Sequence, residues 1–173
     1  MGHRRSIYRY YELGESAIVA EISNLIHAHL PDKYRLKCEV QFSKFIKGGE
    51  QSSILTERAR VDLVIASVKN KKLKAEYIIE VKRAKASKRS ITNDLQRLVA
   101  VKSNKPHVRC FLVVVSETYR PSQFVSPKGT AIHKTIKVID TDGYYKVRLV
   151  CKAASSFKRV ESANYACLIE VFV

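Results

Sequence analysis

Three charged side chains near the ends of two apolar segments have the types and spacing for metal-assisted chemistry. Asp62 lies in the first segment, and Glu80 and Lys82 lie near the end of the second. The polar residues between the segments favour a hairpin centred on Lys71. That centre places Asp62 directly opposite Glu80, with their Cβ atoms about 5 Å apart. Lys82 lies two residues beyond Glu80, so it points to the same side of the hairpin.

Two carboxylates brought together on an apolar sheet are costly unless a cation neutralises them. Oxygen ligands of this kind suit Mg²⁺, with Mn²⁺ as a substitute. Such an ion polarises a phosphodiester and lowers the pKa of a bound water. Lys82 would orient that water, help to deprotonate it, or stabilise charge on the phosphate. The alternative is a solvated hairpin in which Lys82 pairs with one of the acids, but the neighbouring residues are too apolar for an exposed face: Ile78, Ile79 and Val81.

The pattern of Asp62 followed by Glu80-Val81-Lys82 at the end of an apolar strand resembles the active-site signature of the PD-(D/E)xK nuclease superfamily. Members of this superfamily have the restriction-endonuclease-like fold. The resemblance covers about residues 12–117 of this chain. It implies that Asp62 and Glu80 bind the divalent metal, that the carbonyl of Val81 adds a ligand, and that Lys82 is the catalytic lysine.

Many members of this superfamily add an acidic residue from the first helix, and the candidates here are Glu12, Glu15 and Glu21. Glu15 lies on the helix face that carries apolar residues, so we predict that it points towards the sheet as a further catalytic and metal-binding carboxylate. The apolar residues of that face are Ile18, Ile22 and Leu25. Glu21 is the alternative. An acid that only stabilises the start of the helix through the macrodipole is a further interpretation of Glu15.

The net charge of the chain points to a polyanionic partner. The 173 residues include 32 Lys and Arg against 16 Asp and Glu, a formal net charge of +16. We expect DNA before a membrane surface, because no amphipathic helix or polybasic tail gathers the charge. Cations that follow the proposed site predict phosphate contacts, and these are Arg83, Lys85, Lys88, Arg89 and, from the next helix, Arg97. Asp94 and Gln96 of that helix are further candidates for the site.

The elements that position these residues predict an α/β class with a β-rich C-terminal extension, and the resemblance implies a restriction-endonuclease-like mixed central sheet flanked by helices. We expect one domain over residues 1–173, with a core at about 12–117 and the extension at about 118–173. Apolar periodicity predicts two helices and several strands. The helices are 12–30 and 91–103, the latter capped by Ser90, and the strands are 34–46, 59–68, 73–83 and 108–115, followed by strand-like segments at 135–139, 144–152 and 164–173, with Asp142-Gly143 as a turn.

The cysteines and the hydropathy pattern bear on location. The four cysteines, at 38, 110, 151 and 167, form no CxxC pair and each lies in an apolar segment. We expect them to be small buried hydrophobic side chains in a protein of the reducing cytoplasm. No apolar run approaches the roughly 20 residues of a membrane helix, so no membrane partner is expected.

These features favour a Mg²⁺-dependent DNA endonuclease that hydrolyses phosphodiester bonds. The first alternative is a non-catalytic nucleic-acid-binding module of the same fold, and the second is an RNA-directed nuclease. The chain lacks a Walker loop and a G-x-G-x-x-G motif, so no nucleotide cofactor is expected. A protein of this size needs two active sites to cut both strands at once, which makes a homodimer a further expectation.

Overall fold

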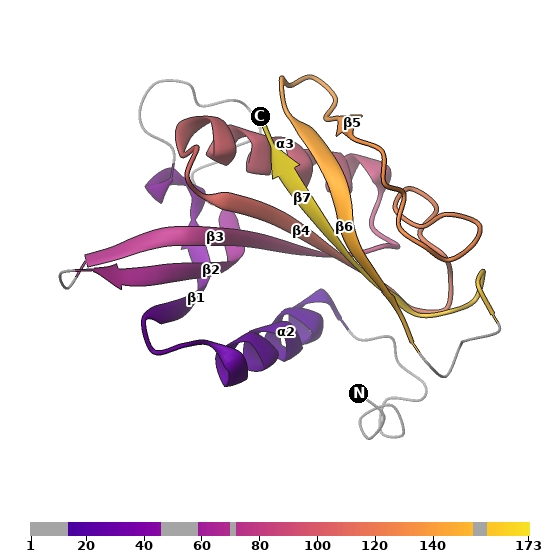
Figure 1. The fold of residues 1–173 in the computed structure, drawn as a ribbon, viewed down its shortest axis with the longest axis horizontal. Coiled ribbons are helices and arrows are strands. Elements are labelled where there is room, and N and C mark those ends of the chain that lie inside the picture. Colours follow the sequence, from indigo (N-terminus) through magenta and orange to yellow (C-terminus); the bar gives the residue numbers. More distant parts are fainter. Residues whose placement is uncertain (1–13, 46–58, 70–71, 154–158) are drawn as a thin grey trace.

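The computed structural model describes residues 14–45, 59–69, 72–153 and 159–173. These residues form a seven-stranded mixed sheet and two α-helices, which gives the expected α/β class with more sheet than helix (Figure 1). The helices are α2 (Glu15–His29) and α3 (Lys88–Asn104), and a short 3-10 helix, η1, spans Phe42–Lys44. The strands are β1 (Tyr34–Gln41), β2 (Arg60–Lys69), β3 (Lys72–Arg83), β4 (Arg109–Ser116), β5 (Ile136–Lys137), β6 (Tyr144–Lys152) and β7 (Tyr165–Phe172).

The strand order in the sheet is β1-β2-β3-β4-β7-β6-β5. β3 and β4 pair in parallel and are joined through α3, as a parallel connection requires a crossover. The other neighbours pair antiparallel. The C-terminal segment is β-rich as expected, and its strands β7, β6 and β5 continue the central sheet beside β4 (Figure 1).

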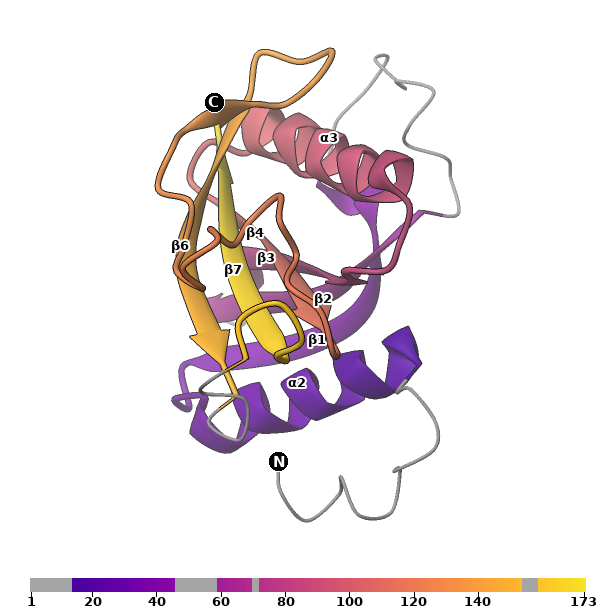
Figure 2. The ribbon, with the colours of Figure 1, turned by 90° about the vertical axis from the view of Figure 1, so that its right-hand side faces the viewer.

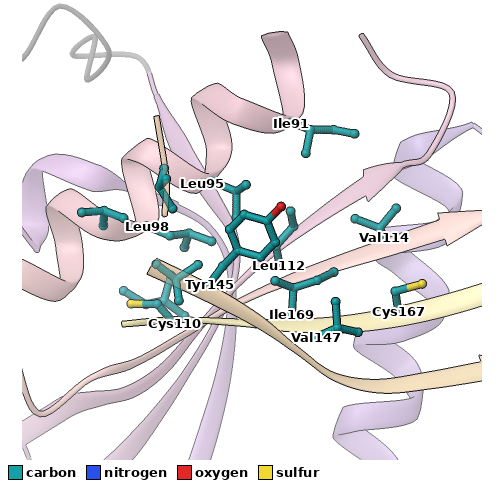
Figure 3. Close-up of a cluster of buried hydrophobic side chains, with 14 of the residues drawn as sticks. Ile91, Leu95, Leu98, Cys110, Leu112, Val114, Tyr145, Val147, Cys167 and Ile169 are labelled. Atoms are coloured by element: carbon teal, nitrogen blue, oxygen red, sulfur yellow. The ribbon is translucent and has the colours of Figure 1, made fainter. Parts of the chain in front are cut away.

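The two helices lie on opposite faces of the sheet (Figure 2). α3 covers one face over a large core to which β4, β6 and β7 also contribute; its members labelled in Figure 3 are Ile91, Leu95, Leu98, Cys110, Leu112, Val114, Tyr145, Val147, Cys167 and Ile169. α2 packs on the other face over a smaller core. The buried members of that core are Ile18, Leu63, Ile79, Val81 and Phe111.

The capping of α3 differs from the prediction. Ser87, and not Ser90, is the N-cap, because the Ser87 hydroxyl accepts a hydrogen bond from the Ser90 N–H at 3.1 Å. The helix therefore begins at Lys88, one turn earlier than expected. The loop between β3 and α3 therefore spans residues 84–87.

Several predicted exposures were wrong. Leu25 is 49% exposed, since the inward side of α2 is formed by Ile18, with Val19, Ile22 and Ile26 partly buried beside it. Cys110 and Cys167 are buried as expected, and burial raises the pKa of each thiol to about 12. The other two cysteines, at 38 and 151, are exposed thiols near the sheet edges.

The hairpin of β2 and β3 also corrects a prediction. Lys69 pairs with Lys72, so the turn is one residue tighter than a centre at Lys71 requires; Lys71 itself lies outside the described residues. A β-bulge between Ile65 and Ala66 restores the predicted register towards the site, where Leu63 pairs with Ile79. Asp62 is therefore directed towards Glu80 as expected.

The turn between β5 and β6 requires its glycine. A Cβ atom at Gly143 would clash with the side chain of Val99 in α3, so the turn packs against the helix only without a side chain. Gln96 of α3 donates a hydrogen bond to the carbonyl of Ile139 at 2.9 Å, which links the same turn to the helix. No helix in the described part of the chain is long and apolar enough to cross a membrane.

Candidate active site

The site begins where the β2–β3 ladder ends. Beyond the Leu63–Ile79 pair, the Asp62 carboxylate accepts a hydrogen bond from the backbone N–H of Val81 at 2.7 Å, in place of a strand carbonyl. In a strand, the N–H and C=O of one residue point to the same neighbour. The carbonyl of Val81 therefore faces the same side as the Asp62 carboxylate, which is the orientation that the predicted metal ligand needs.

β1 also leaves the ladder at this level. Cys38 pairs with Leu63 and Val40 pairs with Val61, but Glu39, with φ of 55°, interrupts the ladder opposite Asp62. A left-handed conformation is costly for a residue with a Cβ atom and is common near functional sites. Asp62 therefore forms no regular ladder pair with its neighbours β1 and β3.

Glu80 is buried beside Asp62. Its residue is 4% exposed, and its Oε1 atom has no hydrogen-bond partner among the described residues. Burial, and then the nearby carboxyl groups of Asp62 and Asp94, raise the pKa of Glu80 well above its ordinary value. Burial also raises the pKa of Asp62, although the Val81 N–H opposes that shift. The pair is an acid cluster that lacks enough positive charge.

Lys82 lies between two acids from opposite helices. Its Nζ atom is 2.9 Å from Glu15 Oε1 in α2 and 3.3 Å from Asp94 Oδ2 in α3. Burial alone would lower the pKa of Lys82, but the two acids raise it to a net value above the ordinary one. The side chain is therefore an ammonium cation at neutral pH, suited to stabilising negative charge.

Asp94 is more central than the sequence analysis indicated. It is 3% exposed, and burial raises its pKa despite contacts with Lys82 and with Arg97, whose Nη1 atom is 3.1 Å away. A signal was present in the sequence, because Asp94 shares the inward face of α3 with Ile91, Leu95 and Leu98 at helical spacing. Gln96, the other candidate of this helix, holds the β5–β6 turn and does not join the site.

Glu15 lies at the site, as the helical phase predicted. Besides its ion pair with Lys82, it accepts a hydrogen bond from the backbone N–H of Arg83 at 3.4 Å. Its side chain remains 39% exposed. Glu21 lies six residues further along α2, about 9 Å along the helix axis from Glu15, and Glu12 lies outside the described residues.

The predicted phosphate contacts divide into two groups. Arg83 and Arg97 are partly buried and pair with acids, Arg83 with Glu117 at 3.4 Å and Arg97 with Asp94. The other three residues are exposed at the end of β3 and the start of α3, and these are Lys85, Lys88 and Arg89. The second group is exposed at the surface, whereas the first balances acidic side chains.

A groove of about 480 Å³ between α2 and β1 opens onto two of the acids, Glu15 and Asp62. Its remaining lining includes the small polar side chains of Ser16, Ser23 and Asn24 and the exposed Glu39. Solvent therefore reaches Asp62 from the α2 side, while Glu80 remains enclosed.

The donor set fits a hard divalent cation. Asp62 and Glu80 supply carboxylate oxygens, and the Val81 carbonyl points to the β2 side, where Asp62 lies. The Glu80 Oε1 atom lacks the positive partner that a buried carboxylate requires. Mg²⁺ is held by one or two carboxylates and keeps several waters. In the described part of the chain, no group of three or more His, Cys, Asp and Glu side chains could hold a metal ion, so the fit rests on the two carboxylates of Asp62 and Glu80. Comparisons of the chain with family models, curated proteins and solved structures found no match.

Proposed function

We propose that the chain is a Mg²⁺-dependent DNA endonuclease with a restriction-endonuclease-like fold, in which Asp62, Glu80 and Lys82 form the active site. The observation that supports it best is the buried carboxylate of Glu80, which has an unpartnered oxygen beside a second acid. Strongly perturbed acids beside a cation, reached by a groove, are typical of catalytic sites and are expensive in a purely structural role.

Asp62, Glu80 and the carbonyl of Val81 would hold Mg²⁺, or Mn²⁺ in its place. When bound, the ion polarises the scissile phosphodiester and lowers the pKa of a bound water. The Val81 N–H fixes one oxygen of Asp62, and the Glu80 side chain lies within hydrogen-bond reach of the same carboxyl group. Glu15 remains a predicted further ligand, and it would have to exchange Lys82 for the ion.

Lys82 would act as a charge-stabilising group. Its raised pKa keeps it protonated, so it is a poor acceptor for the proton of a nucleophilic water. An ammonium group beside the metal ligands instead donates hydrogen bonds to the phosphate, where negative charge develops in the transition state. Asp94 would hold Lys82 in place from α3, opposite Glu15.

DNA affinity would come from the exposed cations near the site and from the net charge of +16. Lys85, Lys88 and Arg89 lie within one short segment beside the end of β3. Contacts of this kind release counterions, so binding should weaken steeply as salt concentration rises.

Cleavage assays test the proposal. Supercoiled plasmid, linear duplex and single-stranded DNA are incubated with the protein in Mg²⁺, Mn²⁺ or EDTA. We expect cleavage with either metal and none in EDTA. Asp62→Asn should be inactive, while Asp140→Asn, at an exposed aspartate whose positive φ asparagine tolerates, should cleave as the parent does. Failure of the parent to cut any substrate, or full activity of Asp62→Asn, would contradict the proposal.

A nucleic-acid-binding module of the same fold is the second candidate. One observation favours it, since the ion pairs of Lys82 with Glu15 and Asp94 already satisfy that lysine without substrate. Such a module would bind DNA in EDTA and cut nothing with either metal. An RNA-directed nuclease is separated from both by repeating the assay with single-stranded and duplex RNA.

A further inference from the structure

The face of the sheet opposite α3 carries an ordered row of aromatic and cationic side chains. Tyr77 of β3 pairs with Arg109 of β4, and Phe172 of β7 pairs with Tyr144 of β6. Because Cys110 pairs with Val171, Arg109 and Phe172 are the next opposed residues of β4 and β7. Tyr77, Arg109, Phe172 and Tyr144, here called the aromatic row, thus cross four neighbouring strands on one face.

The alternation of side chains along each strand places this row away from the α3 core. The residues adjacent to it on β4, β6 and β7 are buried beneath α3, and these are Cys110, Tyr145 and Val171. α2 lies on the same face as the row but packs against β1, β2 and β3, where Tyr77 is partly buried beside its core. In the described part of the chain, Tyr144 of this row is 39% exposed and the Arg109 side chain is 53% exposed.

The rings of the row are arranged as flat surfaces. Those of Tyr144 and Phe172 are nearly parallel, with planes 20° apart and centroids 6.2 Å apart. The Arg109 guanidinium lies over the ring of Phe111 at 5.0 Å and near that of Tyr77 at 6.0 Å. An aromatic ring and a guanidinium plane side by side offer π-faces on which nucleobases stack.

The charges around the row favour an anion. Lys146 pairs across the strands with Glu170 in the next row, and Arg109 and Arg148 both form ion pairs with Glu170. These residues therefore comprise three cations and one acid. A second copy of this chain on this face would bring the same cations together, which is unfavourable. Duplex DNA keeps its base faces stacked inside the helix, whereas an unpaired strand presents both bases and phosphates.

We infer that the aromatic row and Lys146 bind an unpaired segment of nucleic acid, with bases on Tyr144 and Phe172 and phosphates near Lys146 and the arginines. The row crosses β3 and β4 three residue positions before the Glu80 level of the active site, and this odd spacing places it on the other face of the sheet from Glu80. The inference goes beyond the nuclease proposal, because binding here requires neither metal nor cleavage.

The test measures anisotropy of a labelled oligothymidylate of about 15 nucleotides, and of a duplex of the same length, with the full chain in EDTA. Tyr144→Ala should weaken oligothymidylate binding at least about fivefold and leave duplex binding unchanged. Tyr144→Phe should bind as the parent does, since the ring is kept. The matched control is Tyr34→Ala, a half-buried tyrosine near Lys33 on the far edge strand β1, which should have no effect.

A second variant separates phosphate contacts from stacking. Lys146→Ala should flatten the dependence of oligothymidylate affinity on salt by about 0.7 in log–log slope, whereas Tyr144→Ala should leave the slope unchanged. Unchanged oligothymidylate affinity of Tyr144→Ala would overturn the inference, and so would an equal loss of duplex affinity. Sedimentation that shows Tyr144→Ala dissociating a dimer of the parent would assign the face to self-association instead. Because all arms use EDTA, an inactive nuclease does not affect the outcome.

Discussion

Two glutamates beside β4 have opposite electrostatic surroundings. Glu170 on β7 binds Arg109 at 3.0 Å through Oε1 and Arg148 at 2.6 Å through Oε2. Burial alone would raise the pKa of Glu170, but the two guanidinium groups lower it to a net value below the ordinary one. Glu80 on β3 has an unpartnered oxygen and a pKa raised by burial and by neighbouring acids.

Glu170 forms ion pairs that stabilise the fold, whereas Glu80 is a buried acid that lowers the stability of the fold. Glu170 is satisfied by cations of the chain itself. Glu80 lies between Asp62 and Asp94, and the nearby cation, Lys82, makes its close contacts with Glu15 and Asp94. A buried carboxylate without its own cation is understandable where a cation arrives from solution.

The largest effect that we expect is on turnover. Lys82→Ala should reduce cleavage by about 10²–10³-fold, because one well-placed group that stabilises the transition state contributes roughly that much. Binding of DNA in EDTA should be nearly unchanged, since one cation among 32 is lost. The matched control is Lys74→Ala, at the exposed turn end of the same strand. Single-turnover kinetics measure the cleavage rates of both variants. A parental rate for Lys82→Ala would contradict the view that Glu80, unlike Glu170, belongs to an active site.

The second effect is on stability. In EDTA at pH 7, Glu80→Gln should raise the free energy of unfolding by about 1 kcal/mol, because it removes a buried, poorly satisfied carboxylate. Glu170→Gln should lower it by about 1 kcal/mol, since it weakens two partly exposed ion pairs. Urea denaturation measures both changes. Destabilisation of similar size in both variants would show that Glu80 is as well satisfied as Glu170.

A smaller difference is expected within α2. Glu15→Gln should reduce cleavage more than Glu21→Gln, by about tenfold, because Glu15 contacts Lys82 and the Arg83 N–H whereas Glu21 lies about two turns away. Melting temperatures of the two variants should be similar. The opposite order of activities would place the third carboxylate of the site at Glu21.

The pH dependence of stability should differ in sign between the two glutamates. The stabilisation from protonated Glu80 is complete below the ordinary glutamate pKa of about 4.3 and is lost as pH rises through its raised pKa. The stabilisation from ionised Glu170 is present above about 4.3 and is lost as pH falls through its lowered pKa. Urea denaturation across pH in EDTA should show a shallower loss of stability above about pH 4.3 for Glu80→Gln and a shallower loss below it for Glu170→Gln.

The β2–β3 hairpin shows what local sequence patterns could predict and what they could not. The apolar segments and the polar turn predicted that Asp62 lies opposite Glu80, and the register at the Leu63–Ile79 pair agrees. The prediction placed the turn centre incorrectly, and the bulge at Ile65 compensated for that error. Nothing in the alternation of β2 marks the bulge, because Ile65 and Ala66 on either side of it are β-branched or small.

Contacts that are distant in sequence could not be predicted. β7 inserts between β4 and β6, so the last strand of the chain completes the core beside β4. Periodicity identifies strands but does not specify which distant strands pair. The ion pair of Lys82 with Asp94 joins β3 to α3, and the periodicity of each element alone does not bring these two side chains into contact.

The central claim is that Glu80 is unsatisfied because it is a metal ligand. The most direct test is calorimetric titration of Mg²⁺ and Mn²⁺ into the parent, Glu80→Gln and Glu170→Gln at pH 7. We predict that the parent and Glu170→Gln bind the ions with similar affinity and that Glu80→Gln binds neither. Undiminished binding by Glu80→Gln, or no binding by the parent, would contradict the claim.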